Sequence, residues 1–313
     1  PGYAVSWADS LGTEWETPRG IRLKVGEPRI EAQPMVQTEK PWETAYTLHT
    51  TIFEDDGIYR LYYTCHNQMS GDAKSERQQN PYSYFLCYAE SEDGVQWKKP
   101  NIGTINWRGT NDNNIVYGMD SALGRPVPTA TVFKDPSAPP SERYKIIHRG
   151  RIEDGTRCVY GATSPDGINW TAIQNPIIPD YFSDTQIVAR FDQQKGRYCG
   201  YFRGWTKHSG GKVHGRRTIA YAETEDFNNW PVPETIFTTD VHDHPGADIY
   251  TNAYTLWPDA DAHLMFPAFY EREIDITQIQ LLTSRDGVRW ERHTREPVIG
   301  GGEPGTSGSP RQD

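Results

Sequence analysis

The stretch SRDGVRW, Ser284 to Trp290, is the last of four copies of one seven-residue pattern. The earlier copies are SEDGVQW from Ser91, SPDGINW from Ser164 and TEDFNNW from Thr224. Each copy reads Ser or Thr, any residue, Asp, Gly or Phe, two further residues and Trp. Spacings of 73, 60 and 60 residues separate the consecutive aspartates Asp93, Asp166, Asp226 and Asp286. A period of this length is typical of a repeated supersecondary unit.

A short strand pattern precedes each copy: FLCYAE, CVYGAT, TIAYAE and IQLLT, all rich in aromatic and β-branched residues. The Asp side chain can bind its own backbone and Gly can adopt a positive φ, so each copy is predicted to be a turn after which Trp opens the next strand. A second predicted hairpin lies before each of these, as in TLHTTIFEDDGIYRLYYTC and TQIVARFDQQKGRYCGYF. The repeated unit is therefore two hairpins, or four antiparallel strands.

Radial repetition of four-stranded antiparallel units is a β-propeller, and we predict an all-β, five-bladed one. A β-sandwich is the alternative, but it does not require the same turn at a 60-residue period. One domain is expected over residues 1–313, with blades at 41–100, 101–178, 179–238 and 239–296. The remaining segments, 1–40 and 297–313, are expected to close the ring as a fifth blade. That blade is incomplete if the Gly- and Ser-rich C-terminal segment supplies no strand.

Composition limits the partners. The net charge is −10 and the isoelectric point is about 5.4, which disfavours nucleic acid and anionic membranes because both require a basic surface. Mean hydropathy is −0.76, and no apolar run approaches the ~20 residues of a membrane span, so a soluble protein is expected. The compartment stays open between secreted, periplasmic and cytoplasmic, and the oligomeric state is undetermined.

The four cysteines lie within strand patterns and have no metal-like spacing; they are Cys65, Cys87, Cys158 and Cys199. Neither a zinc site nor a disulfide framework is implied, and buried free thiols are the simplest interpretation. HDHPGAD, His242 to Asp248, contains metal-ligating residue types, but a Pro- and Gly-rich loop with two histidines is most often only a polar loop. We therefore expect no essential metal or cofactor.

Several segments together resemble the five-bladed β-propeller glycoside hydrolases. They are AESEDGVQW, ATSPDGINW, KDPSAPPSERYKII, SDTQIV, YFRGW and ADIYTNA. More narrowly, the chain resembles proteins similar to the N-terminal domain of invertase-type family 32 enzymes, and family 43-like proteins, from about Pro41 onward. The resemblance implies a funnel at one end of the propeller axis where three carboxylates meet a sugar, and it allows a structural Ca²⁺ on the axis.

Three acidic residues match that expectation. Asp184 opens the inner strand of the third unit, Asp248 opens that of the fourth, and Glu43 precedes the first. All three stand at the same end of their strands, which a convergent cluster requires, although acidic residues also favour strand ends in general. Asp135, in KDP, resembles a family motif but follows its strand, so we expect it in a turn at the far face. The family's Asn-Asp-Pro and Glu-Cys patterns are absent, so the substrate is not assumed to be fructose.

Other residues are expected to bind the substrate at the same rim. The second strand of each hairpin returns to that rim and delivers Arg149 and Arg203, whose guanidinium groups can orient carboxylates or bind sugars. Gln186 shares a strand face with Asp184 by the period of two. The remaining candidates are aromatic or imidazole side chains, of which the aromatic ones can stack on sugar rings: Tyr250, Trp205 and His49.

The sequence thus favours a glycoside hydrolase that acts on a terminal sugar or short oligosaccharide through carboxylate acid/base chemistry. The alternative is a carbohydrate-binding propeller without catalysis, which the missing family motifs keep open. Carboxyl groups about 5 to 10 Å apart in one funnel would favour hydrolysis, and scattered ones would favour binding.

Overall fold

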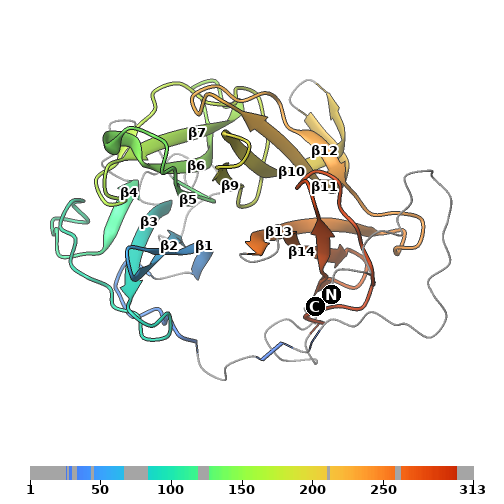
Figure 1. Ribbon diagram of the computed structural model, residues 1–313, viewed down its shortest axis with the longest axis horizontal. Coiled ribbons are helices and arrows are strands. Elements are labelled where there is room, and N and C mark those ends of the chain that lie inside the picture. Colours follow the sequence, from blue (N-terminus) through green and yellow to red (C-terminus); the bar gives the residue numbers. More distant parts are fainter. Residues whose placement is uncertain are drawn as a thin grey trace.

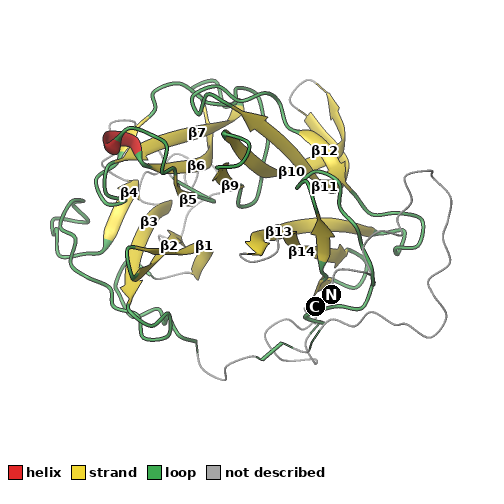
Figure 2. Cartoon of the chain, in the orientation of Figure 1, coloured by secondary structure: helices red, strands yellow, loops and turns green. Residues whose placement is uncertain are grey.

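The computed structural model describes residues 26, 28–29, 34–43, 46–66, 84–118, 127–209, 212–257 and 262–301. Within these residues, strands form four sheets and the only helical element is a short 3-10 turn, Pro140–Glu142 (Figure 2). No helix in this part of the chain is long and apolar enough to cross a membrane.

Each of the first three sheets contains four antiparallel strands in chain order. The first contains β1 (Tyr46–Asp55), β2 (Ile58–His66), β3 (Tyr84–Ser91) and β4 (Ile115–Gly118). The second contains β5 (Thr131–Lys134), β6 (Tyr144–Arg151), β7 (Arg157–Ser164) and β8 (Thr171–Ala172). The third contains β9 (Val188–Asp192), β10 (Arg197–Ser209), β11 (Lys212–Thr224) and β12 (Glu234–Phe237).

The fourth sheet departs from this order. It contains β13 (Ala247–Trp257), β14 (Ala262–Glu271), β15 (Ile276–Ile279) and β16 (Leu282–Ser284). Both β15 and β16 pair with β14, so they are two halves of one interrupted third strand. Outside them, single bridges join Thr283 to Glu291 and Ile279 to Ile299.

The four sheets are arranged around a common centre with β1, β5, β9 and β13 innermost (Figure 1). This confirms the predicted antiparallel propeller, but the described residues form four blades instead of five. The expected fifth blade falls on 1–40 and 297–313, which lie largely outside the described residues. The predicted blade boundaries also shift, because β4 belongs to the first sheet although it lies beyond residue 100.

Three of the four repeated turns have the same internal hydrogen bonds. In the second copy, Ser164 Oγ accepts the N–H groups of Asp166 and Gly167 at 3.2 and 2.9 Å, and Asp166 Oδ1 accepts those of Ile168 and Asn169 at 2.8 Å. The copies that begin at residues 91 and 284 repeat this pattern. Such local bonding explains why Ser and Asp stand two residues apart.

The turn tryptophan has a local role as well. Trp170 Nε1 donates to Gly167 O at 3.1 Å, and Trp230 Nε1 donates to Phe227 O at 2.9 Å, so each indole closes its own turn. Only in the second blade does a strand follow this tryptophan directly, as β8. In the first and fourth blades the residue after tryptophan makes a single bridge.

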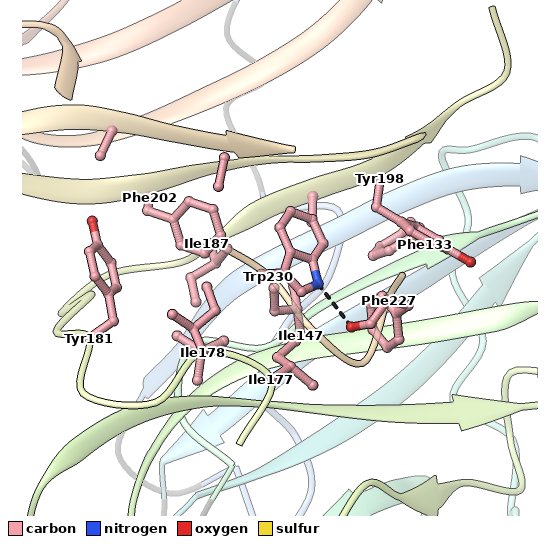
Figure 3. Packing of buried hydrophobic residues seen from close by; sticks show 14 residues of the cluster. Phe133, Ile147, Ile177, Ile178, Tyr181, Ile187, Tyr198, Phe202, Phe227 and Trp230 are labelled. Carbon is pink, nitrogen blue, oxygen red and sulfur yellow. Dashed lines mark hydrogen bonds between the residues drawn. The ribbon is translucent and has the colours of Figure 1, made fainter. Parts of the chain in front are cut away.

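Hydrophobic clusters lie between successive blades. One of them joins the second and third blades, where Trp230, Phe227, Tyr198 and Phe133 pack with Ile147 (Figure 3). In this copy Phe227 replaces the turn glycine, and its buried ring fills the space between the blades. Burial of large aromatic side chains is the main stabilising contribution here.

Hydrogen bonds join neighbouring blades at the turn end. Tyr144 Oη donates to Asp55 Oδ2 and Tyr198 Oη donates to Asp135 Oδ2, both at 2.5 Å. In each case an aspartate at or just after the end of an inner strand meets a tyrosine that opens, or nearly opens, the second strand of the next blade. This explains the tyrosine near the start of each of those strands, and it places Asp135 in the turn that we expected.

Candidate functional site

A cavity of about 270 Å³ lies where the four blades meet. Every sheet contributes to its lining, as a site on a propeller axis requires. None of the lining residues belongs to a copy of the repeated turn. The lining residues are His49, Thr64, His66, Tyr84, Pro128, Thr129, Arg149, Asp184, Thr185, Arg203 and Tyr250.

Three lining residues occupy equivalent positions in the second strands. Thr64, Arg149 and Arg203 each stand five residues after a tyrosine, namely Tyr59, Tyr144 and Tyr198. The C-terminal parts of β2, β6 and β10 all lie at the cavity, so these three side chains line it together. The sequence predicted the two arginines at this rim, because each is a charged residue late in a returning strand. Thr64 carries no charge, and the sequence analysis missed it.

The inner strands are irregular where they meet the cavity. The register of β1 shifts at His49, which has φ +53°, and that of β13 shifts at Tyr250. Thr129, just before β5, has φ +63°. Positive φ values at residues other than glycine are strained and, like β-bulges, cluster at functional sites, where they redirect a side chain. Here they direct three side chains into the cavity, and this was not foreseen for Thr129.

Asp184 lies in the cavity between two guanidinium groups. Arg149 Nη1 donates to Asp184 Oδ1 at 2.8 Å, and Arg203 Nη1 lies 3.4 Å from Oδ2. The Asp184 side chain remains 41% exposed, whereas that of Arg203 is only 3% exposed. Burial and the positive charge of Arg217 together lower the pKa of Arg203 to about 10, although Asp184 opposes the shift.

His49 is a neutral imidazole at neutral pH. Burial first, and then the charges of Arg149 and Arg203, lower its pKa to about 4 against the opposing effect of Asp184. A neutral imidazole can both donate and accept hydrogen bonds, which suits contact with sugar hydroxyls.

Asp248 does not line the cavity. Its side chain is 0% exposed, and Oδ2 accepts hydrogen bonds from Arg217 Nη1 at 2.8 Å and Arg272 Nε at 3.0 Å. Asp248 lies inside β13, opposite Tyr270 of β14, so the sheet encloses it. The structure therefore places this predicted catalytic carboxylate in a buried ion pair.

Glu43 is also placed elsewhere. Lys99 Nζ donates to its carboxylate at 2.8 and 2.9 Å, Tyr63 Oη donates at 2.7 Å, and two backbone N–H groups complete its shell. Burial raises the pKa of Glu43, but these hydrogen bonds outweigh burial and the net pKa is lowered. Lys99 lines a separate cavity of about 350 Å³ formed by the first blade and the segment before it. The three predicted carboxylates thus do not converge.

Two other candidates lie outside the cavity lining. Gln186 Nε2 donates to the backbone oxygen of Thr50 at 3.0 Å, a link between the third and first blades. Trp205 stacks on Phe182 with ring centroids 6.1 Å apart, and the Arg217 guanidinium lies 5.5 Å from the Trp205 ring.

Several buried polar atoms of the lining have no hydrogen-bond partner among the described residues. They include Thr64 Oγ1, Thr129 Oγ1, Arg149 Nε and Arg203 Nε. Buried polar groups are normally paired, and each unpaired one costs about 1 to 3 kcal/mol. Such a set is typical of a site built for a polar ligand. Within the described ranges, no group of three or more His, Cys, Asp or Glu side chains could hold a metal ion.

Two curated proteins are similar to this chain in sequence. No family model matches the chain. The uncharacterized proteins MT1551 and Rv1502 of two Mycobacterium tuberculosis strains are each 26% identical over 212 residues, 64% of this chain. The chain spans 61% of the length of these curated relatives.

Several solved structures are similar to this chain in fold over most of its length. A glycoside hydrolase is similar with a TM-score of 0.56 and 13% identity, over 81% of this chain and 74% of that one. The α-L-arabinofuranosidase PaAbf62A of Podospora anserina, in complex with cellotriose, has a TM-score of 0.53 and 14% identity over 86% and 74%. A thermostable family-43 glycoside hydrolase has a TM-score of 0.51 and 10% identity over 82% and 75%. The chain therefore has the antiparallel propeller fold that these glycoside hydrolases share.

Proposed function

We propose that this protein hydrolyses a glycosidic bond and that the cavity between the four blades is its active site. The observation that carries the proposal is the lining itself, in which an exposed carboxylate lies among buried polar groups that lack protein partners. Several glycoside hydrolases share this fold, which supports a hydrolase but does not identify its substrate.

Asp184 is the proposed catalytic carboxylate. Asp184 accepts hydrogen bonds from two arginines, and a carboxylate held as an acceptor suits a base, a nucleophile or a stabiliser of positive charge on the sugar. It does not suit the acid that protonates the leaving group. Arg149 and Arg203 hold the carboxylate in place, and Tyr250, which is 44% exposed, offers a ring face to a sugar.

The second candidate is a carbohydrate-binding propeller without catalysis. Asp184 is the only carboxylate in the described lining, whereas glycosidases usually employ a pair. Asp248 and Glu43 are both engaged in buried ion pairs outside the cavity. Without a second carboxylate in the described lining, no carboxylic acid there can protonate a leaving group. For substrates that require this protonation, the observation favours binding over hydrolysis.

One screen tests both candidates. Nitrophenyl glycosides, methyl glycosides and plant or algal oligosaccharides would be incubated with the protein and the products identified. Binding of the same compounds would be measured by calorimetry. Cleavage that Asp184→Asn abolishes while binding persists supports the hydrolase. Binding without cleavage, including of nitrophenyl glycosides that need little protonation, supports the binding propeller.

A further inference from the structure

Two clusters of arginines and carboxylates lie in and beside the cavity, on the second, third and fourth blades. Asp184 is shared by Arg149 and Arg203, and Asp248 is shared by Arg217 and Arg272. Within these two clusters four guanidinium groups face two carboxylates, an excess of two positive charges. This excess is local, since the chain as a whole has a net charge of −10.

Tyr250 connects the two clusters into one surface. The Arg203 guanidinium lies 4.9 Å from the centre of its ring, and the Arg217 guanidinium lies 5.1 Å from the same centre. The Arg217 guanidinium also lies 6.0 Å from the ring of Tyr270. Arginine and aromatic side chains therefore alternate from the cavity outward. A ligand on this surface would contact aromatic rings and positive charges side by side.

The titration behaviour of two lining residues agrees with this excess of charge. Burial lowers the pKa of His49, and Arg149 and Arg203 lower it further despite Asp184. Burial likewise lowers the pKa of Arg203, with Arg217 adding to the effect. Both residues thus lie where positive charge is disfavoured, and a bound anion would relieve this repulsion.

We infer that the glycan bound in this cavity carries an anionic group, namely a carboxylate, a sulfate or a phosphate, that pairs with these arginines of the second, third and fourth blades. This rests on the proposed action on carbohydrate. Guanidinium groups bind such anions through paired N–H donors, and the partnerless hydroxyls of Thr64 and Thr129 remain for sugar hydroxyls. At about 270 Å³ the cavity is small for a ligand site, which suits a single charged sugar unit.

The test uses matched pairs of sugars that differ only in charge. Methyl glycosides of glucuronate, galacturonate and mannuronate would be compared with those of glucose, galactose and mannose by calorimetry at low salt. The 6-sulfates and 6-phosphates of the same neutral sugars form the other arms and identify which anion is preferred. We expect at least one acidic member to bind about tenfold or more tightly than its neutral parent, with a preference that shrinks as salt is added.

Variants connect the preference to the arginines. Arg217→Gln is expected to reduce the preference for the acidic sugar about tenfold, whereas Arg217→Lys, which keeps the charge, retains most of it. Arg285→Gln is the matched control, since it removes an exposed arginine from the repeated turn of the fourth blade. Circular dichroism and melting temperature would establish that each variant is folded, and Arg149→Gln provides a second test if Arg217→Gln is not.

The outcomes separate this inference from the proposed function. Tighter binding of neutral parents, or no acidic member bound at millimolar concentration, overturns the inference; cleavage of neutral glycosides would then leave the hydrolase proposal standing. Acidic sugars that bind through these arginines but are never cleaved support the inference and count against the hydrolase. An acidic preference that survives Arg217→Gln and Arg149→Gln also overturns it.

Discussion

The two ends of the blades differ in how their polar groups are satisfied. At the turn end, Ser164 and Asp166 are bound by backbone N–H groups of their own turn, and two further copies repeat the arrangement. At the cavity end, Thr64 and Thr129 have buried hydroxyls without partners, and His49 has a positive φ. At the turn end the polar groups bond to one another, within a turn or between neighbouring blades, whereas at the cavity end several have no partner among the described residues.

This difference shows how a repeated fold acquires a single site. Each blade can use the same turn because the hydrogen bonds that shape the turn come from its own residues. The cavity end is not repeated, because the equivalent position holds Thr64 in the first blade but arginines, Arg149 and Arg203, in the second and third. Binding groups arise where the copies diverge, and the following changes test the two ends against each other.

The largest effect is expected for Asp184→Asn at the cavity end. This change removes the charge and preserves the shape, so kcat on a cleaved glycoside should fall about 10²- to 10⁴-fold. The melting temperature should change little because the side chain is 41% exposed. Asp180→Asn is the control, since Asp180 is an exposed aspartate outside the cavity lining, four residues earlier. Near-normal turnover of Asp184→Asn in a steady-state assay would show that the catalytic group lies elsewhere.

Gly167→Ala tests the turn end. Gly167 has φ +79°, and an added Cβ would lie 2.3 Å from Tyr62 Oη of the preceding blade. Strain and overpacking together should lower the free energy of unfolding by about 3 kcal/mol in denaturant titrations. Gly196→Ala, at φ +64° with no atom within 4 Å of the added Cβ, should cost only about 1 kcal/mol. Equal losses would mean that the turn is not packed against its neighbour.

A pH effect is expected from His49. Its pKa is about 4 in the folded protein because burial and then Arg149 and Arg203 disfavour the proton, whereas an unfolded histidine titrates near 6.5. The unfolded chain therefore takes up the proton first as pH falls. The contribution of His49 to stability is complete above pH 6.5 and is lost as pH falls to about 4, by about 2 to 3 kcal/mol.

The matched variant for this effect is His49→Asn, because asparagine tolerates the positive φ. Carboxylates that titrate in the same range are common to both proteins, so the difference between their stability curves isolates His49. Unfolding free energies measured from pH 4 to pH 8 should show a smaller slope in the variant. Identical slopes would contradict a depressed pKa.

The smallest effect is expected for Tyr198→Phe, which removes a hydrogen bond between blades. Asp135 is buried and loses the donor that lies 2.5 Å from its Oδ2, so unfolding should require about 1 to 2 kcal/mol less. Tyr270→Phe removes an exposed hydrogen bond to Asp275 at 2.8 Å. Its effect on the free energy of unfolding should be only a few tenths of the effect of Tyr198→Phe. Thermal or chemical denaturation would measure both, and a neutral Tyr198→Phe would show that this link contributes little.

The predictable part of the site depends on strand direction. Because the second strand of each hairpin returns to the start of the first, the sequence predicted that Arg149 and Arg203 reach the end where Asp184 stands, and both contact it. Strand direction did not predict which acids stay accessible. Asp184 precedes β9 and lies in the cavity, whereas Asp248 is inside β13 and is enclosed by its neighbours.

The sequence by itself determined the repeated unit, since the turn pattern acts through hydrogen bonds that span three or four residues. It also determined the antiparallel, four-stranded character of the blades. Only the tertiary structure decided which polar groups share the cavity. That depends on register shifts at His49 and Tyr250 and on arginines from other strands, such as Arg217 beside Asp248. These contacts join residues far apart in the chain, and no local pattern specifies them.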